Sequence, residues 1–421
     1  MLLHEMTPEA NRAGSSYLPN EVLEMVFMNL LGDPTVDWHS RFQRKDIKQF
    51  VNNVRGAQPA DFLLVCRQWT RVILHNRRLW TTVLVDGWTI RKQGPEVVRA
   101  KIKAHLQHSG NEPLDVIYVT IRDPYQSSWE AWEAWEPEPS TAPRKSHSSR
   151  QIGDLFKVVA GQGGQEMKRW KSCIAAWSEE SLMSDFLFYP TPLLESLCIS
   201  NFTTAWPIFP DTPVLKRLVT TSHYQQIGTG VPLPCMESAD ISEGRFSESH
   251  FSFGYQGIKL LRQISEVRFL NILVGCGQYY HLLEEEEPLR FPNLVDLRLE
   301  GDIYSFLIQN LKAPRLNSLT LHVKSAAGHE ELLDNLAQAD LPELSRLDLD
   351  LIKDGDPLWT LDEVRPSVIG MLSTKETLRT VIGTADLEGV VAGCRKTLPS
   401  FLPRVVFSFR VRDIDTVYCG W

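Results

Sequence analysis

The stretch Pro292-Asn293-Leu294-Val295-Asp296-Leu297-Arg298-Leu299 decides the fold, because close copies of it recur along the chain. Two clear copies follow it, Pro314-Arg315-Leu316-Asn317-Ser318-Leu319-Thr320-Leu321 and Pro342-Glu343-Leu344-Ser345-Arg346-Leu347-Asp348-Leu349. Earlier copies begin at Pro192 and Pro213, and two degraded ones are anchored at 236 and 264. A unit that recurs in this way usually identifies the architecture.

The spacing of these copies predicts a stack of short strands. The anchor leucines or their equivalents stand at 194, 215, 236, 264, 294, 316 and 344, so the steps are 21, 21, 28, 30, 22 and 28 residues. Leucine-rich repeats have periods of about 20–29 residues, and stacked units share one core. We therefore expect an α/β fold in which residues 166–421 form a leucine-rich-repeat-like solenoid. It is irregular, because Asp302, Lys324 and Ile352 replace the usual Asn or Cys.

Within each copy the last two apolar residues should point inward and the residue between them outward. Outward positions of mixed charge suit recognition of a polar protein surface, although simple solvation is an equally open interpretation. The candidate substrate-facing residues are Arg268, Asp296, Arg298, Thr320, Arg346 and Asp348. Further strands are expected at Trp170–Ile174, Thr377–Ile382 and Val405–Val411, the last after a helix at Leu387–Cys394.

The composition excludes several classes of protein. The chain has 421 residues, enough for two or three packed units, with 43% hydrophobic and 23% charged residues. These values are those of a globular chain rather than a disordered one. The formal charge of -8 disfavours nucleic acid as a partner. We see no apolar run of about 18 residues and no secretory leader, so we expect no membrane association and a cytoplasmic and/or nuclear location.

The N-terminal region reads as a small helical bundle after a flexible lead-in at 1–17. Leu18-Pro19 should open a helix that runs to Leu30, since proline suits the first helical turn. Its apolar stripe comprises Val22, Leu23, Val26, Phe27 and Leu30. A second helix is expected from about Asp61, with Phe62, Val65, Cys66 and Trp69 on one face.

These two segments resemble the F-box. The family pattern Leu-Pro-x-Glu-(Leu/Val)-Leu is matched by Leu18-Pro19-Asn20-Glu21-Val22-Leu23, and its second half is matched by Val65-Cys66-Arg67-Gln68-Trp69. Leu79-Trp80 follows downstream. The resemblance is strongest to F-box proteins of mushroom-forming fungi, where a similar helix ends in Ser-Gly-x-x-Pro-Leu, here Ser109 to Leu114. One departure is an insertion at 32–61 within the 18–86 module, which lengthens the loop between the helices.

The resemblance implies a function. F-box proteins bind a Skp1-like adaptor, which joins them to a cullin–RING ubiquitin ligase, while the rest of the chain selects a protein substrate. On this basis we expect a non-catalytic substrate receptor of an SCF (Skp1–cullin–F-box) ligase, with the substrate itself unknown. The residues expected to bind the adaptor are Leu18, Pro19, Val22, Leu23, Val26, Phe27, Leu63, Val65, Cys66, Trp69, Leu79 and Trp80.

Residues 87–165 read as a connecting αβ segment. A helix is expected at Pro95–His108, closed by Gly110, and a strand at Leu114–Ile121. The tryptophan-, proline- and serine-rich stretch 127–150 is expected to be a disordered loop.

No catalytic, metal-binding or cofactor-binding motif was found. The chain has no nucleophile elbow, phosphate-binding loop or dinucleotide fingerprint, and its seven cysteines are scattered. His105 with His108, and the run Glu284–Glu287, are better explained as surface features than as metal ligands. We therefore expect no enzyme and no cofactor. Two alternatives stay open, a leucine-rich-repeat-like interaction scaffold that does not bind Skp1, and an enzyme that uses a cysteine such as Cys276.

Overall fold

The computed structural model describes residues 18–31, 51–56, 58–120, 149–177, 188–200, 208–221, 230–242, 254–273, 288–300, 304–323, 329–351, 361–384 and 405–410. The expected lead-in 1–17, most of the 127–150 loop, most of the 32–61 insertion and the Leu387–Cys394 helix lie outside the described residues.

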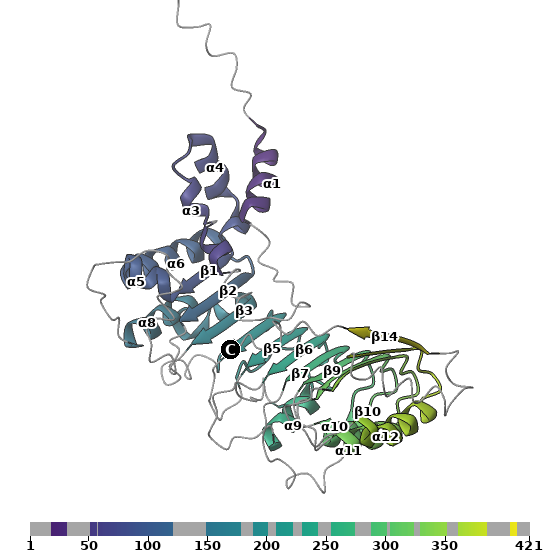
Figure 1. Ribbon diagram of the computed structural model, residues 1–421. Coiled ribbons are helices and arrows are strands. Elements are labelled where there is room, and N and C mark those ends of the chain that lie inside the picture. Colours follow the sequence, from purple (N-terminus) through teal and green to yellow (C-terminus); the bar gives the residue numbers. More distant parts are fainter. Residues whose placement is uncertain are drawn as a thin grey trace, which may run out of the picture.

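A twelve-stranded parallel sheet forms the body of the molecule, a mixed α/β fold (Figure 1). All twelve strands lie side by side in chain order, with β9 beside β7 and β11 beside β9, because β8 and β10 form a separate pair. The strands of the large sheet are β1 Thr82–Asp86, β2 Leu114–Thr120, β3 Trp170–Trp177, β4 Ser196–Ser200, β5 Arg217–Thr221, β6 Ser238–Ser242, β7 Phe269–Leu273, β9 Asp296–Glu300, β11 Ser318–Val323, β12 Arg346–Leu351, β13 Thr380–Thr384 and β14 Val406–Arg410. The pair consists of β8 Leu289–Arg290 and β10 Leu311–Lys312.

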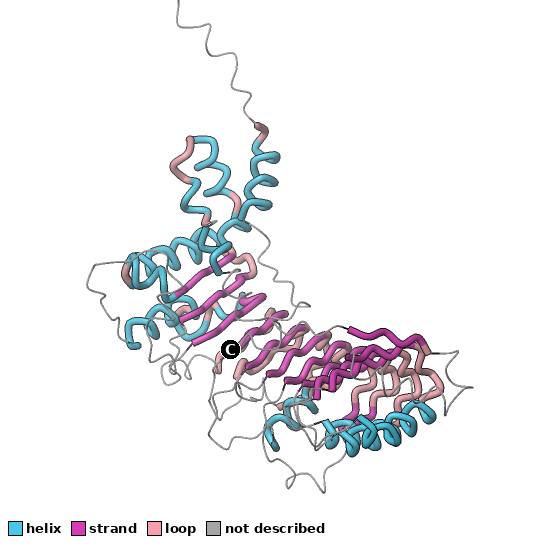
Figure 2. The backbone as a smooth tube through the Cα atoms, viewed as in Figure 1, coloured by secondary structure: helices cyan, strands magenta, loops and turns pink. Residues whose placement is uncertain are grey.

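Helices from residue 87 onward cover one face of this sheet (Figure 2), whereas the helix at 51–56 lies on the other face. The α-helices are α1 Asn20–Leu31, α3 Pro59–Phe62, α4 Arg67–His75, α5 Gly87–Gln93, α6 Pro95–Ser109, α8 Ser149–Ala160, α9 Gly254–Gln263, α10 Tyr304–Asn310, α11 His329–Gln338 and α12 Leu361–Thr374. Short 3₁₀ turns occur at η1 Arg77–Trp80, η2 Gln162–Gly164 and η3 Met167–Arg169, and residues 51–56 are also helical. Within the described residues, no helix is long and apolar enough to cross a membrane.

The core lies between the sheet and these helices. In register across the sheet, one inward row comprises Val83, Val116, Cys173, Leu197, Leu218, Ala239, Leu270, Leu297, Leu319, Leu347 and Val381. All of them are buried in a single cluster that also contains residues from α6, α8, α9, α10, α11 and α12. Because side chains alternate between the two faces along a strand, an apolar residue at every second position of each strand is enough to build this continuous core.

The repeats occupy the predicted strands, with one error of phase. The copy anchored at Ile264 was read with Val267 and Phe269 as its last apolar pair. In the structure Leu270 and Ile272 occupy those inward positions, while Phe269 is exposed. The anchor of this copy is therefore Val267, and the two flanking steps become 31 and 27 residues instead of 28 and 30. The error arose because the repeat pattern finds an apolar residue at all three of its positions whether it is anchored at Ile264 or at Val267.

The sheet extends further toward the N-terminus than the repeat pattern does. β1 pairs with β2, and β2 pairs with β3, so strands from the 18–86 module and the 87–165 segment continue the same sheet. The repeat period is not visible there because α5, α6 and α8 lengthen the connections. The expected flanking strands at 170, 377 and 405 correspond to β3, β13 and β14.

The second N-terminal helix differs from the expectation. Instead of one helix from about Asp61, the chain forms the single turn α3, a turn at 63–66, and then α4. The hydroxyl of Thr70 donates to the carbonyl oxygen of Leu63 at 2.5 Å, which holds the turn against the first turn of α4. Val65 and Cys66 therefore lie outside the helical face on which they were placed.

Candidate functional site

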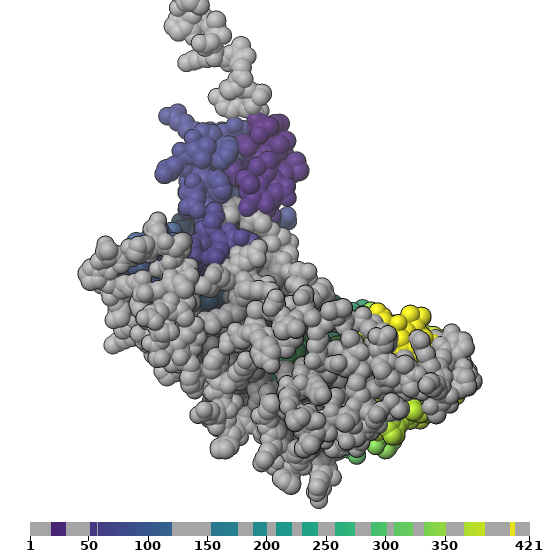
Figure 3. Space-filling model, viewed as in Figure 1, coloured from purple at the N-terminus to yellow at the C-terminus, as the bar shows by residue number. Residues whose placement is uncertain are grey.

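The helical bundle formed by α1, α3, α4 and η1 is the first candidate site. It lies at the end of the sheet that carries β1 (Figure 1), and its purple and blue atoms project from the molecule in Figure 3. Pro19 starts α1, and its carbonyl oxygen accepts from the backbone N–H groups of Val22 and Leu23. The side-chain amide of Gln68 donates to the carbonyl oxygen of Leu18 at 2.8 Å and so ties the start of α1 to α4.

An aromatic cluster holds the bundle together. Phe27 is completely buried and meets the indole of Trp69 edge-on, with 5.0 Å between ring centroids, while Phe62 lies 6.0 Å from Phe27. Such edge-to-face pairs add to the free energy gained from burial. Leu23, Val72, Ile73, Leu79 and Trp80 complete this core.

The bundle is anchored to the sheet domain through Trp80. The indole N–H of Trp80 donates to the carbonyl oxygen of Ile73 at 2.8 Å. The backbone carbonyl oxygen of Trp80 lies 3.1 Å from Nδ1 of His105 on α6. Because a carbonyl can only accept, Nδ1 of His105 carries the proton. Burial lowers the pKa of His105 to about 4, so the ring is neutral. The ring of His108 packs against the same indole, with 4.6 Å between the ring centroids.

The residues expected to bind an adaptor fall into three groups. Leu18, Pro19, Val26, Val65 and Cys66 are exposed, and Val22, Leu63 and Trp69 are half-buried. The remaining four, Leu23, Phe27, Leu79 and Trp80, are buried. The expectation is corrected for these four, since a side chain without exposed surface supports the bundle from inside and offers no contact area to another protein.

The bundle also exposes apolar side chains that the sequence analysis did not select. Leu64 is 95% exposed and Met25 59%, and Met28 is exposed as well. Leu30, which the sequence analysis placed in the inward apolar stripe, is 53% exposed and belongs to the same surface. The stripe analysis looked only for the inward face of each helix, so Met25 and Met28 on the opposite face escaped it. Their apolar character at outward positions was the available signal. Together with Leu18, Val26 and Val65, they give the projecting bundle an apolar surface that the described chain does not cover.

The outward face of the sheet is the second candidate site. The strand register places Asp296 beside Ser318 and Arg346, and Arg298 beside Thr320 and Asp348. All of the predicted substrate-facing residues except Arg268 therefore lie in these two adjoining rows. Arg268 does not, because it precedes β7, and Phe269 and Asn271 occupy the outward positions of that strand. This correction follows from the shifted anchor of the repeat.

The outward rows are linked by polar contacts between neighbouring strands. Arg298 donates from Nη2 to Nε2 of His322 at 3.0 Å, and Nδ1 of His322 donates to Asp350 at 3.1 Å. His322 and Asp350 form a third row, which the sequence analysis missed because its pattern ended one residue earlier. Burial raises the pKa of Asp296, with partial compensation from the hydroxyl of Ser318 and the charge of Arg346. Asp348 is only 6% exposed.

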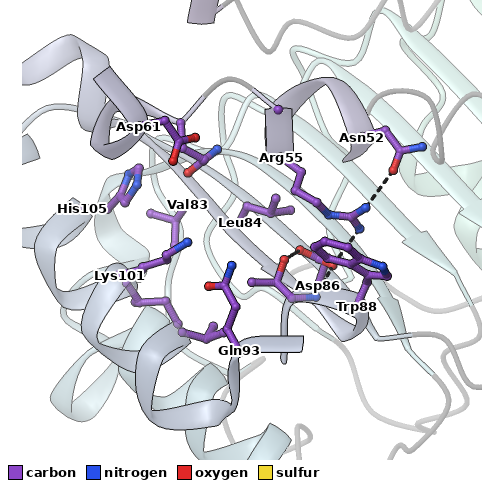
Figure 4. Close-up of a pocket in the computed structure, with 15 residues that line it drawn as sticks. Asn52, Arg55, Asp61, Val83, Leu84, Asp86, Trp88, Gln93, Lys101 and His105 are labelled. Carbon is purple, nitrogen blue, oxygen red and sulfur yellow. Dashed lines mark hydrogen bonds and ion pairs between the residues drawn. The ribbon is translucent and has the colours of Figure 1, made fainter. Parts of the chain in front are cut away.

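Several side chains surround a cavity of about 350 Å³ between the bundle and the first strand (Figure 4). Lys101 and His105 of α6 form one wall, and Asn52 and Arg55 of the 51–56 helix lie across from them. Arg55 pairs with Asp86 at 2.8 Å, and its guanidinium lies 4.4 Å from the ring centroid of Trp88.

The described part of the chain offers little for enzyme chemistry. No group of three or more His, Cys, Asp and Glu side chains there could hold a metal ion. Burial raises the pKa of the Cys173 and Cys198 thiols, which disfavours the reactive thiolate. Cys66 and Cys235 are exposed, whereas Cys276 and Glu284–Glu287 lie outside the described residues.

Comparison with known proteins adds little to this picture. No protein-family model matches the chain, and no curated protein matches it. Among solved structures, a structural-genomics protein from Bacteroides fragilis aligns over 67% of this chain and 77% of its own, with 12% sequence identity and a TM-score of 0.26.

Proposed function

We propose that this chain is the non-catalytic substrate-recognition subunit of an SCF ubiquitin ligase. In this proposal the bundle is an F-box that binds a Skp1-like adaptor, and through it a cullin–RING ligase. The sheet with its helices is an irregular leucine-rich-repeat-like solenoid that selects a protein substrate. The chain contributes proximity and orientation, which can lower a reaction barrier without any catalytic group of its own.

The observation that carries the proposal is the apolar surface of the projecting bundle. Leu64, Met25 and Val65 are each more than half exposed, although the bundle already has a filled aromatic core. An exposed apolar patch on a small helical unit is typical of a protein-docking surface. The sequence resemblance of Leu18–Leu23 and Val65–Trp69 to the F-box suggests the class of partner.

The test is co-purification with a Skp1-like adaptor. We expect Met25→Asp plus Val65→Asp to abolish adaptor binding, because both charges would have to be buried without partners at the interface. Both side chains are exposed, so the fold should be unaffected. The matched control is Val97→Asp plus Val231→Asp, two exposed valines outside the bundle, which should bind the adaptor like the unmodified chain.

A second candidate is an interaction scaffold that does not bind an adaptor. It is favoured by the four predicted docking residues that are buried inside the bundle, and by the anchoring of Trp80 on α6. This alternative predicts that the unmodified chain and both double variants fail equally to retain a Skp1-like adaptor, while their thermal unfolding curves coincide.

A further inference from the structure

The outward face of the sheet changes character between β5 and β6. The middle outward row, read in register from β2 to β12, is apolar in its first four members and polar in its last five. The apolar members are Ile117, Ile174, Cys198 and Val219, and the polar members are Asp240, Asn271, Arg298, Thr320 and Asp348. A solvated face has no need of four consecutive apolar side chains, so this half is built to be covered.

The 51–56 helix covers it. Val51 and Val54 are buried and pack in one cluster with the four apolar members of the row. Residues three apart lie on the same face of a helix, so both valines point to the sheet together. The insertion between α1 and α3 thus reaches from the bundle to the sheet face on which the polar candidate residues lie.

Arg55 fixes the position of this helix along the sheet. Its guanidinium pairs with Asp86 at the end of β1, lies over the ring of Trp88 and also donates to Asn52 at 2.9 Å. Asp86 is nearly buried and also accepts from the backbone N–H of Thr89, so it is held in place independently of Arg55. Asp86 and Trp88 therefore form an acidic and aromatic site beside the apolar row.

Among the described residues, the apolar contacts of the helix lie on the flank that faces the sheet. Its opposite flank, with Asn52, Arg55 and Gly56, borders the cavity of about 350 Å³ (Figure 4). Nε of Arg55 is buried and has no hydrogen-bond acceptor among the described residues. Among the described residues, the helix is held by Val51, Val54 and Arg55 and by the side-chain amide of Gln58, which donates to the carbonyl oxygen of Val54, and a hollow lies behind it. So short a set of contacts favours local opening over permanent packing.

We propose that the outward face of β2–β5 is a helix-binding groove, occupied here by the 51–56 helix as an internal ligand. The displacing partner is a protein helix that carries two branched aliphatic residues three positions apart, followed directly by arginine. This inference rests on the proposed function only in that the partner is the protein the sheet selects. The groove itself exists and can be measured without an adaptor.

The chemistry of the internal ligand defines that of the partner. The aliphatic pair fills the row formed by Ile117, Ile174, Cys198 and Val219, and the arginine reaches Asp86 and Trp88. Recognition of an amphipathic helix in an apolar groove needs only such a short set of anchors. Further residues of a longer partner would continue onto the polar half, at Asp240 and beyond.

The experiment removes the internal ligand and supplies it from outside. A fluorescent peptide with the sequence of residues 48–58 is added to the full chain carrying Val51→Asp plus Val54→Asp, and binding is followed by anisotropy. We expect saturable binding at least about tenfold tighter than to the unmodified chain, whose groove is occupied. Adding Val219→Asp to the double variant should abolish binding, as should the same two aspartates in the peptide.

Two results would overturn the inference. In the first, the double variant keeps its circular dichroism spectrum and its adaptor binding, but it binds the peptide no more tightly than the unmodified chain does. Should the double variant not fold, Arg55→Glu alone frees the helix while leaving both valines. For that variant, unchanged hydrogen exchange at residues 51–56 and unchanged peptide binding would equally refute displacement. Failure of the unmodified chain to bind an adaptor would contradict the proposed function and leave the groove inference intact.

Discussion

At the scale of single residues, His105 links the bundle to the sheet domain through its protonation state. Its ring is neutral in the folded protein and donates from Nδ1 to Trp80, and burial lowers its pKa from 6.5 to about 4. In the unfolded chain the ring titrates near its ordinary value. Between pH 6.5 and 4 the unfolded state therefore binds a proton that the folded state does not, and stability falls as the pH falls.

We expect this single group to lower the free energy of unfolding by about 3 kcal/mol over that range, since one pKa unit corresponds to about 1.4 kcal/mol. The measurement is urea unfolding of the unmodified chain and of His105→Asn at several pH values. Asparagine keeps a donor for the Trp80 carbonyl but does not titrate. The difference between the two proteins should shrink as the pH drops, and a difference independent of pH would show that His105 takes up its proton with the same pKa in the folded and unfolded states.

At the scale of elements, Phe27 decides whether the bundle holds its shape. Its ring fills the space between α1, α3 and α4 and touches both Trp69 and Phe62. Phe27→Ala should cost about 3–5 kcal/mol, the usual range for removing a buried phenylalanine. Hydrogen exchange should accelerate in α1 and α4 but not in β9–β12. The matched change is Met28→Ala, the exposed neighbour on the same helix, which should leave exchange within error of the unmodified chain.

The elements also show what the sequence could and could not predict. Leucines that recur in the same Leu-x-x-Leu-x-Leu spacing place their strands in a shared core, so the strands near 196, 217, 296, 318 and 346 were predictable. The phase at Val267 was not, because two overlapping frames are both apolar there. The break between α3 and α4 at residues 63–66 was not predictable, because the apolar residues in this turn continue the helical periodicity.

The candidate surfaces were predictable only in part. Outward positions such as Arg298 and Thr320 follow from strand alternation alone. The apolar row under the 51–56 helix does not, because Ile117, Ile174 and Val219 come from three distant segments that only the sheet register brings together. The same is true of burial in the bundle, where Phe27 reads as part of an exposed docking motif until Trp69 and Phe62 are placed around it.

At the scale of the whole molecule, the sheet is a one-dimensional array. Every described strand of the large sheet pairs only with its neighbours in order, from β1 to β14. Stability in such an array comes from each unit and from its contacts with the next one, so damage should remain near its origin. A compact domain with a central core would instead lose protection throughout.

Leu319 offers a direct test of this locality. It is completely buried between Leu297 of β9 and Leu347 of β12, in the C-terminal part of the inward row. Leu319→Ala should cost about 2–5 kcal/mol, as for other buried leucines. Hydrogen exchange should accelerate in β9, β11 and β12, while the amides of β1, β2 and β3 keep their protection. Thr320→Ala, the next residue on the outward face, is the control. If Leu319→Ala loosens β1–β3 as much as β11, the sheet unfolds as a single cooperative unit and binding at one end can influence the other.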